Sequence, residues 1–454
     1  MGACGSKDPQ TSGGGESTKR YDTANQSANG DSAEKHPDFG LKETHDLKKF
    51  LGRGGTGDTY LFIDKRNSQP VAIKLIKRPI PKVILPNILR EIRIQAELGE
   101  GHVNVIEAKE VLVTHTHLAL SLEYAAGGSL TSYVADRWQH SQHSGLFLSE
   151  DEARYFFRQF IGAVEYCHKH LVAHRDLKLD NTLLDNSDPP MLKLCDFGFA
   201  KTWTEDANMF THIGTPVYMS PELINSRNGA KGYDGKSVDV WASGVLLIVM
   251  LLGTFPFDHT EHPDPNTSEA HLEVWLQQVR SLWSEIPHIQ KAVEKLSKEC
   301  MDLLNRIFVV DDKKRITIEA IKEHPWYNKP LLPKYEAAER NVQLKQEAIE
   351  KKIAGRRINQ TLLAQRNQEL QVMVDQAASR PQSGNAGHTA PFMRVDLREE
   401  TVTEHATPGA PGVGQRMSLD LGQTMNMRNF KDLGQVKEDD EAELARQQSM
   451  RMPA

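Results

Sequence analysis

Apolar and polar residues follow three different patterns along the chain. Residues 1–45 are rich in Gly, Ser, Asn, Asp and Lys and almost free of large apolar side chains. From about residue 47 to residue 326, apolar runs alternate with turn signals. A segment that buries little apolar surface cannot offset the entropy it loses on ordering. The pattern therefore predicts a disordered N-terminal tail over 1–45 and a folded domain over 46–327.

The folded domain changes its periodicity after its first third. Residues 61–76 (LFIDKRNSQPVAIKLI) predict two strands around a turn at 67–70. Residues 150–170 carry apolar side chains at about 3.6-residue spacing behind Ser149, a helix N-cap residue. The most apolar run, 240–252, is too short to cross a bilayer and favours a buried core helix. Strands followed by helices predict an α+β protein with a small β-rich N-terminal lobe and a larger helical C-terminal lobe.

The last part of the chain divides in two. Residues 335–378 are strong helix formers with few apolar positions, which predicts a charged helical segment. Residues 379–454 are rich in Gly, Pro, Ser and Met without periodicity, which predicts a disordered C-terminal tail.

Composition narrows the class of protein further. A hydrophobic content of 39% with 26% charged residues suits a soluble globular protein, and the net charge of −6 gives no electrostatic reason to expect nucleic acid as a partner. The first forty-five residues lack an apolar core, so we expect no secretory signal. The four cysteines are far apart and indicate reduced cytosolic thiols: Cys4, Cys167, Cys195 and Cys300.

A glycine-rich turn follows the start of the folded domain. Gly52, Gly54 and Gly57 have the spacing GxGxxG, which lets backbone amides approach phosphate oxygens without interference from a Cβ. The pattern alone is weak. A dinucleotide site is the alternative, but it requires a helix after the turn, whereas apolar residues of strand type follow here.

Lys74 ends the apolar run VAIK, and a lysine on a buried strand is costly without a partner. Glu91, in the helical stretch 87–98, could supply the carboxylate. The alternative is a surface lysine and a solvated glutamate.

Three further motifs follow in order: HRDLKLDN at 174–181, DFG at 196–198 and SPE at 220–222. Phosphoryl transfer requires a carboxylate to receive the hydroxyl proton, oxygen ligands for magnesium and cations at the phosphates. Asp176 is the candidate for the carboxylate, and Asn181 with Asp196 for the metal ligands. Lys74 and Lys178 are the candidate cations. Together these motifs predict a kinase domain.

From about residue 47 to residue 326 the chain resembles eukaryotic protein kinases. Residues 147–185, 192–201 and 300–317 are similar to plant and green-algal kinases related to the yeast sucrose-non-fermenting kinase, in their second, osmotic-stress and abscisic-acid-responsive group. The resemblance implies a serine/threonine kinase that uses ATP and magnesium in stress or nutrient signalling. A kinase-fold scaffold without catalysis is the alternative, and the intact set of Lys74, Asp176, Asn181 and Asp196 argues against it.

The resemblance also implies a role for each matching residue. Asp176 would be the catalytic base, Lys178 would contact the γ-phosphate, and Lys74 would hold the α/β-phosphates while paired with Glu91. Thr215 would hydrogen-bond to Asp176 and Lys178. The residues implied for magnesium are Asn181 and Asp196, those for adenine are Ala72, Leu122 as gatekeeper, Glu123, Ala125 and Leu183, and those for structure are Asp239, Glu222 and Arg315.

Some positions depart from the pattern of the family. Ser129 stands where an acidic receptor for a substrate arginine is often found, whereas Asp180 keeps the other acidic position. We therefore expect protein substrates with a Ser or Thr and a basic residue upstream. Thr59 replaces a usual valine over the adenine, and the segment 258–285 is longer than usual.

Residues 196–222 carry the expected switch. Thr211 lies four residues before Thr215 and resembles the activating phosphorylation site of the group. Its phosphate would find a cation in Arg175 and a second in Lys201. This predicts an upstream kinase and a phosphatase as partners. The alternative is that Thr211 is an ordinary exposed loop residue.

The chain begins with MGACGSK, which fits the N-myristoylation pattern at Gly2, and Cys4 lies where palmitoylation often follows. One acyl chain binds membranes only marginally, so Cys4 would supply the second signal. These residues predict a cytoplasmic protein attached peripherally to a membrane when acylated, with the nucleus as a further compartment. An unmodified tail is the alternative.

The resemblance gives the segment 335–378 a role as well. A helix after the domain would pack against the helix that bears Glu91 and steady it, and the alternative is a merely solvated helix. Residues 444–449 (LARQQS) match the L-x-R-x-x-S substrate pattern and suggest autophosphorylation at Ser449.

Overall fold

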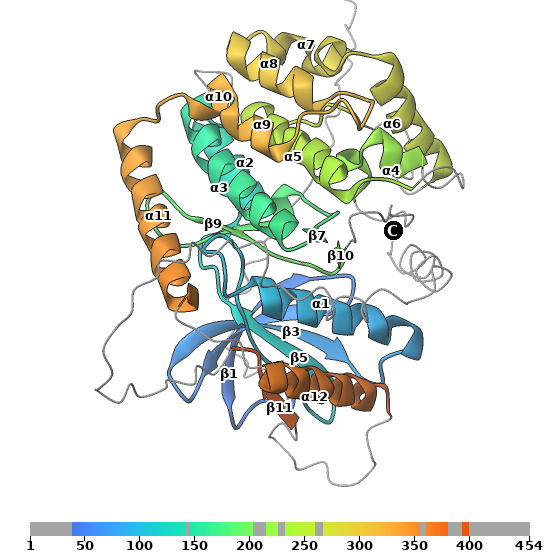
Figure 1. Ribbon diagram of the computed structural model, residues 1–454, viewed down its shortest axis with the longest axis vertical. Helices are drawn as coiled ribbons and strands as arrows, with labels where there is room; N and C mark the ends of the chain where they lie inside the picture. The colour runs from blue at the N-terminus through green and yellow to red at the C-terminus, as the bar shows by residue number, and fades with distance from the viewer. Residues whose placement is uncertain are drawn as a thin grey trace, which may run out of the picture. The chain divides into compact units, whose positions relative to one another are not determined.

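The computed structural model describes residues 39–140, 146–202, 215–225, 232–258, 267–354, 360–379 and 393–398 (Figure 1). Gly2, Cys4, Thr211 and Ser449 lie outside these residues.

The N-terminal lobe is an antiparallel sheet with helix α1 (Leu85–Leu98) packed on it. Its strand order is β1-β2-β3-β5-β4-β11. The strands are β1 (His45–Arg53), β2 (Asp58–Asp64), β3 (Gln69–Lys77), β4 (Ala108–Val113), β5 (His117–Glu123) and β11 (Met393–Asp396). The strand β3 begins inside the turn predicted at 67–70, so that turn lies slightly earlier, at 65–68.

The C-terminal lobe is mainly helical. Its helices are α2 (Leu130–His140), α3 (Glu150–Lys169), α4 (Pro221–Asn225), α5 (Gly235–Leu252), α6 (Ser268–Arg280), α7 (Pro287–Val293), α8 (Lys298–Ile307), α9 (Ile318–Glu323) and α10 (Pro325–Asn328). Short strands form two further small sheets, β6-β8-β9 and β10-β7. These strands are β6 (Gly128–Ser129), β7 (Val172–Ala173), β8 (Thr182–Leu184), β9 (Leu192–Leu194) and β10 (Lys201–Thr202). The 3-10 turns are η1 (Lys82–Ile84), η2 (Leu179–Asn181), η3 (Pro216–Tyr218) and η5 (Trp283–Glu285). The predicted α+β fold with two lobes is confirmed.

Local sequence explains the two central helices. The hydroxyl of Ser149 accepts a hydrogen bond from the Glu152 amide and so caps α3, as expected. Helix α5 is long and apolar enough to cross a membrane, but 89% of its apolar window is buried inside the protein. It is the buried core helix that the run 240–252 predicts. It ends at Gly253, whose φ of 67° suits glycine.

The N-terminal tail is ordered further upstream than the pattern predicts. Leu41 is only 1% exposed and packs with Phe62 and Ile73 against one face of the sheet. Phe39 packs on the Tyr60 ring, with centroids 5.0 Å apart. The expectation of disorder over 1–45 is therefore wrong for residues 39–45. Two apolar side chains in a polar stretch form no periodic signal, although they are enough to cover the sheet.

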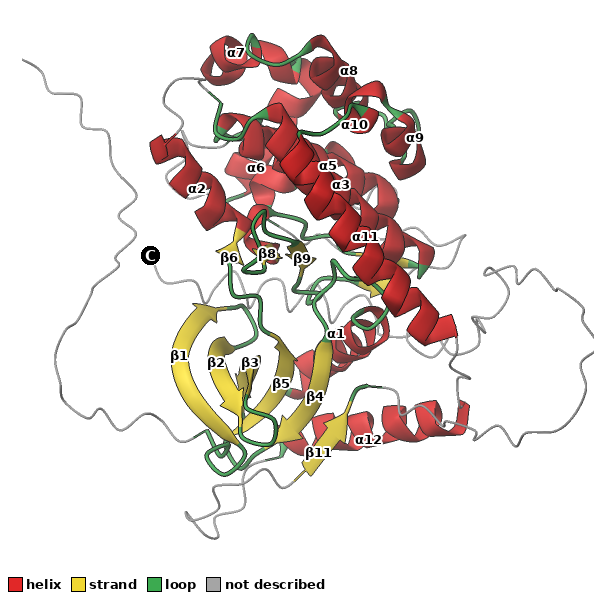
Figure 2. Ribbon diagram, turned by 90° about the vertical axis from the view of Figure 1, so that its left-hand side faces the viewer, coloured by secondary structure: helices red, strands yellow, loops and turns green. Residues whose placement is uncertain are grey.

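Within the residues of the C-terminal segment that the structure describes, the chain forms α11 (Pro333–Ala354), α12 (Gln360–Ala378) and β11, where one helix followed by a disordered tail was expected. Helix α12 packs against α1, and β11 lies beside β4 (Figure 2). The expectation of disorder over 379–454 is therefore wrong for residues 393–398. A four-residue strand whose partner is far away in the sequence leaves almost no local pattern.

Candidate active site

Lys74 and Glu91 form a buried ion pair between β3 and α1. The distance from Lys74 Nζ to Glu91 Oε1 is 2.5 Å, and their side chains are 11% and 8% exposed. Asp196 Oδ1 lies 3.9 Å from the same ammonium. Burial alone would lower the pKa of Lys74, but the carboxylates of Glu91 and Asp196 raise it well above its ordinary value. Lys74 therefore keeps its positive charge and is held next to Asp196.

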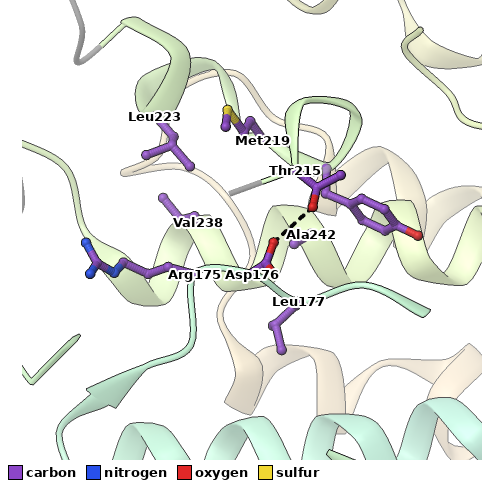
Figure 3. A pocket seen from close by; sticks show the side chains of 9 residues that line it. Arg175, Asp176, Leu177, Thr215, Met219, Leu223, Val238 and Ala242 are labelled. Carbon is purple, nitrogen blue, oxygen red and sulfur yellow. Dashed lines mark hydrogen bonds between the residues drawn. The ribbon is translucent and has the colours of Figure 1, made fainter. Parts of the chain in front are cut away.

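Asp176 accepts hydrogen bonds from three neighbouring side chains. Lys178 Nζ donates to Oδ2 at 2.8 Å, and Asn181 Nδ2 donates to the same oxygen at 2.9 Å. The hydroxyl of Thr215 donates to Oδ1 at 3.0 Å and itself accepts from Lys178 Nζ at 2.9 Å. Figure 3 shows Asp176 and Thr215 facing each other beside a cavity that Leu223 and Val238 also line. These bonds fix the direction in which the carboxylate points.

Asp239 of helix α5 holds the loop that carries Asp176. Asp239 is fully buried, and its carboxylate accepts from the backbone amides of His174 (2.9 Å) and Arg175 (2.8 Å). His168 Nε2 lies 2.8 Å from the same carboxylate. Arg175 has a φ of 64°, a left-handed conformation that costs free energy unless its surroundings enforce it. Asp239 provides that enforcement.

Asp196 and Asn181 are the residues predicted to hold a metal ion. Asp196 follows β9 with a φ of 62°, and its carboxylate accepts from the Gly198 amide at 3.2 Å. Burial would raise the pKa of Asp196, but Lys74 and the Gly198 amide hold it below its ordinary value. The amide nitrogen of Asn181 is used by Asp176, which leaves its Oδ1 as the ligand atom. Carboxylate and amide oxygens suit a magnesium ion.

The glycine-rich turn connects β1 to β2. A Cβ on Gly57 would lie 2.3 Å from the Leu75 carbonyl oxygen, so only glycine fits. A Cβ on Gly52 would meet nothing within 4 Å, and the Gly54 amide donates to the Gly57 carbonyl at 2.9 Å. Gly57 is thus required by packing. Gly52 has no side chain and faces open space, so its backbone is accessible to a phosphate, as a phosphate-binding turn requires.

The residues implied for adenine come from four separate segments. Ala72 of β3 is paired with Leu122 of β5, and Leu183 lies in β8. Glu123 is the last residue of β5, and its carboxylate forms a 2.6 Å ion pair with Lys193. Ala125 lies in the segment between β5 and β6.

The geometry can be compared with known proteins. A model of the protein kinase domain matches residues 45–327. The chain is 42% identical over 289 residues to serine/threonine-protein kinase SRK2G of Arabidopsis thaliana, covering 64% of this chain and 74% of the relative. It is also 42% identical to the serine/threonine-protein kinases SAPK7 of Oryza sativa subsp. japonica and SAPK3 of Oryza sativa subsp. indica, covering 64% of this chain and 73% and 79% of theirs.

The chain belongs to the protein kinase family. Within the family, it is a serine/threonine kinase of the SnRK2 group, the second group of plant kinases related to the yeast sucrose-non-fermenting kinase, to which the SRK2 and SAPK relatives belong. Members of the family generally use ATP and a divalent metal, and their substrates are proteins.

The structure describes Arg175 and Lys201, the two cations expected to bind a phosphate on Thr211. Arg175 is buried, and its guanidinium donates to the Phe199 carbonyl (2.9 Å) and to the Tyr233 hydroxyl (3.1 Å). Lys201 lies in β10, which pairs with β7. Arg315 forms a bidentate pair with Glu222 at 2.6 and 2.9 Å.

Sequence reasoning missed several residues that support the site of the kinase. Tyr233 orients Arg175, and Gln278 of α6 donates to the Met219 carbonyl at 2.8 Å. Gln346 of α11 bonds to Gly101 and Val103 in the loop between α1 and β4. Each contact joins residues more than forty positions apart, so spacing along the chain gives no signal for it. Gln278 lies in the segment 258–285, which the sequence singled out as longer than usual, but the sequence did not predict the contact of Gln278 with Met219.

Proposed function

We propose that this kinase transfers the γ-phosphate of magnesium-bound ATP to a serine or threonine hydroxyl of another protein in stress or nutrient signalling. The observation that carries the proposal is the orientation of the Asp176 carboxylate by Lys178, Asn181 and Thr215. A carboxylate held in this way is built to orient a hydroxyl group and to receive its proton.

The other side chains supply the binding and the charge. Lys74, held by Glu91, would contact the α/β-phosphates, and Lys178 would contact the γ-phosphate. Asn181 and Asp196 would hold magnesium, since their oxygen atoms form a suitable donor set. When bound, the metal neutralises charge that develops on the transferred phosphoryl group. Gly52, Gly54 and Gly57 would cover the phosphates, with the adenine between Ala72 and Leu183 and against Glu123 and Ala125.

The substrate preference rests on Asp180. Its carboxylate accepts a hydrogen bond from the Thr131 hydroxyl at 3.0 Å, so it is already oriented before a peptide binds. A substrate arginine could pair with it, which supports a preference for a basic residue upstream of the Ser or Thr.

The test of the proposal is transfer of labelled phosphate to an Arg-x-x-Ser peptide, with and without magnesium. We expect transfer to stop when EDTA removes the metal and to weaken when Ala replaces the peptide arginine. Metal-independent labelling would contradict the proposed mechanism. The alternative, a scaffold without catalysis, predicts no transfer under any of these conditions.

Phosphorylation of Thr211 is the proposed switch. An upstream kinase would add the phosphate and a phosphatase would remove it, with Arg175 and Lys201 as the cations nearest in the family pattern. Arg175 also contacts Phe199, which follows the DFG motif directly, so a phosphate at Arg175 would act on the segment next to Asp196. We expect Thr211→Ala to abolish activation by an upstream kinase, and full activation of that variant would exclude Thr211 as the switch.

Acylation at Gly2 and Cys4 is the proposed route to a membrane surface. We expect a cytoplasmic kinase that is recovered with membranes when both residues are modified, with the nucleus as a further compartment. Gly2→Ala should move the protein from the membrane fraction to the soluble fraction. An unchanged distribution would favour the unmodified tail.

The segment 335–378 is proposed to steady the helix that bears Glu91. The support is the apolar contact of α12 with α1, in which Leu370, Met373 and Val374 are fully buried. Deleting 335–378 should lower activity, and unchanged activity would refute this role.

A further inference from the structure

The strand β11 extends the sheet of the N-terminal lobe beyond the last strand of the kinase domain. It pairs antiparallel with β4, from Met393 opposite Val113 to Asp396 opposite Glu110. The Leu397 amide continues the ladder by donating to the Lys109 carbonyl at 2.9 Å. β11 therefore satisfies backbone groups of β4 that an uncovered edge would expose.

A cluster of charges with buried carboxylates lies beside this added strand, and its two arginines, Arg66 and Arg394, are 36% and 43% exposed. Glu110 of β4 and Asp64 of β2 have side chains that are 3% and 6% exposed, and Arg66 bridges them at 2.6 and 2.7 Å. Arg394 of β11 donates from Nε to the second oxygen of Glu110 at 2.5 Å. His45 lies 3.7 Å from Glu110, and burial lowers its pKa.

The balance of charge in the cluster depends on β11. With Arg394 in place, two guanidinium groups face two carboxylates. Without it, Arg66, which contacts both oxygens of Glu110 at 2.6 and 3.2 Å, would be the one guanidinium shared by two buried carboxylates. The excess negative charge in a buried site is destabilising. His45, Asp64 and Glu110 lie close enough together to hold a metal ion. The two arginines already occupy the carboxylate oxygens, so we interpret the group as an ion-pair cluster.

Residues 393–398 also cover the apolar face of α12. Val395 and Leu397 are 6% and 1% exposed and belong to one cluster with Val374 of α12 and Ile92 of α1. Arg366 of α12 donates to the Leu397 carbonyl at 2.8 Å. The strand and the helix are thus held to each other as well as to the lobe.

Two arginines of the kinase domain hold α12 at two points. Arg93 of α1 donates to the Asn367 carbonyl at 3.2 Å, near the middle of the helix. Arg78, which follows β3, donates to the Gln376 carbonyl at 2.7 Å, near its end. These bonds connect α12 to the two elements that carry Lys74 and Glu91.

We propose that Arg394 is a positioning residue for the ion pair of Lys74 and Glu91. Arg394 anchors β11 to Glu110, and β11 covers the apolar face of α12. Helix α12 in turn packs on α1 and holds Glu91 opposite Lys74. The inference rests on the proposed function only for its consequence in catalysis, since the anchoring itself is a property of the fold.

The test compares two full-length variants, Arg394→Ala and Arg398→Ala. Arg398 serves as the matched control because it lies four residues further along and forms an exposed ion pair with Asp396, whose side chains are 48% and 40% exposed. For Arg394→Ala we expect faster hydrogen exchange in α1 and α12 and a kcat/KM for ATP lowered about fivefold or more. For Arg398→Ala we expect both to remain within about twofold of the wild type, because an exposed ion pair contributes little.

A rescue variant separates positioning from general destabilisation. Glu110→Gln in the Arg394→Ala background removes the excess buried negative charge and leaves Arg66 paired with Asp64. Exchange in α1 and kcat/KM should therefore both return toward the wild type. The proposal is overturned if Arg394→Ala leaves exchange in α1 unchanged, or if Glu110→Gln restores thermal stability but neither exchange nor kcat/KM. A wild type without kinase activity would refute the proposed function, while the exchange data would still decide the anchoring.

Discussion

At the scale of single residues, the site depends on charges that hold one another in place. Burial disfavours the ammonium of Lys74 and the carboxylate of Asp196. Lys74 keeps its charge because Glu91 and Asp196 lie close by, and Asp196 keeps its charge because Lys74 does. The motifs in the sequence identified these residues, because each lies in a short local pattern. Their partner Glu91 lay in no such pattern, and only the need of a buried lysine for a carboxylate pointed to it.

We predict that Glu91→Ala destabilises the protein by about 3–5 kcal/mol, because it leaves the Lys74 ammonium buried without its closest partner. Replacing the pair together, with Lys74→Met and Glu91→Leu, should recover most of the loss, since no buried charge remains. Urea denaturation measures both effects. The double variant should still lack phosphate transfer, and a double variant as unstable as Glu91→Ala would contradict the buried-pair account.

Buried His102 is expected to make the folded protein less stable at acidic pH. Burial, reinforced by the charge of Lys193, lowers the pKa of His102 to about 4, and its Nδ1 accepts from the Asn104 amide at 3.1 Å. Between the ordinary pKa of 6.5 and about 4, the unfolded chain binds the proton and the folded chain does not. Stability therefore falls as the pH drops through this window, by up to about 1.4 kcal/mol per pH unit for one proton.

His102→Gln should flatten this slope, as measured by urea denaturation at several pH values. His117, whose pKa burial also lowers to about 4, should contribute in the same direction, so His102→Gln with His117→Gln should flatten the slope further. An unchanged slope in the double variant would contradict the assignment.

At the scale of elements, the sequence predicted best those helices and strands that bury a whole face. Helices α3 and α5 have long apolar patterns with caps at Ser149 and Asp234, and the sheet strands have apolar runs between turns. By contrast, β11 could not be predicted. Only Val395 and Leu397 of this segment are buried, and the partners that make them a strand are β4 and α12, far away in the chain.

Helix α12 offers a matched pair of substitutions two residues apart. Val374 is fully buried against α1, whereas Val372 is 49% exposed. Val374→Asp would bury a carboxylate in the apolar cluster, so we expect α12 to detach and kcat/KM for ATP to fall about fivefold or more. Val372→Asp should leave both unchanged. Steady-state kinetics with the two variants measure the difference, and equal activity would show that α12 does not support α1.

At the scale of the whole molecule, the candidate site is assembled from both lobes. Lys74 and Glu91 come from the sheet and α1, while Asp176, Asn181 and Asp196 come from loops supported by α5 and β9. The motifs and their order in the sequence predicted these residues, because each role in phosphoryl transfer requires a particular residue type. It could not predict how Tyr233, Gln278 and Arg394 support them, because those contacts depend on the folded arrangement of distant segments.

The most direct test of the central claim is phosphate transfer by the wild type and by Asp176→Asn, each after an upstream kinase has phosphorylated Thr211. Asparagine keeps the size of the side chain but cannot receive the proton, so we expect transfer to fall about 10²-fold or more while ATP still binds. A wild type as inert as the variant would contradict the enzyme and favour the scaffold. A variant as active as the wild type would contradict the role of Asp176.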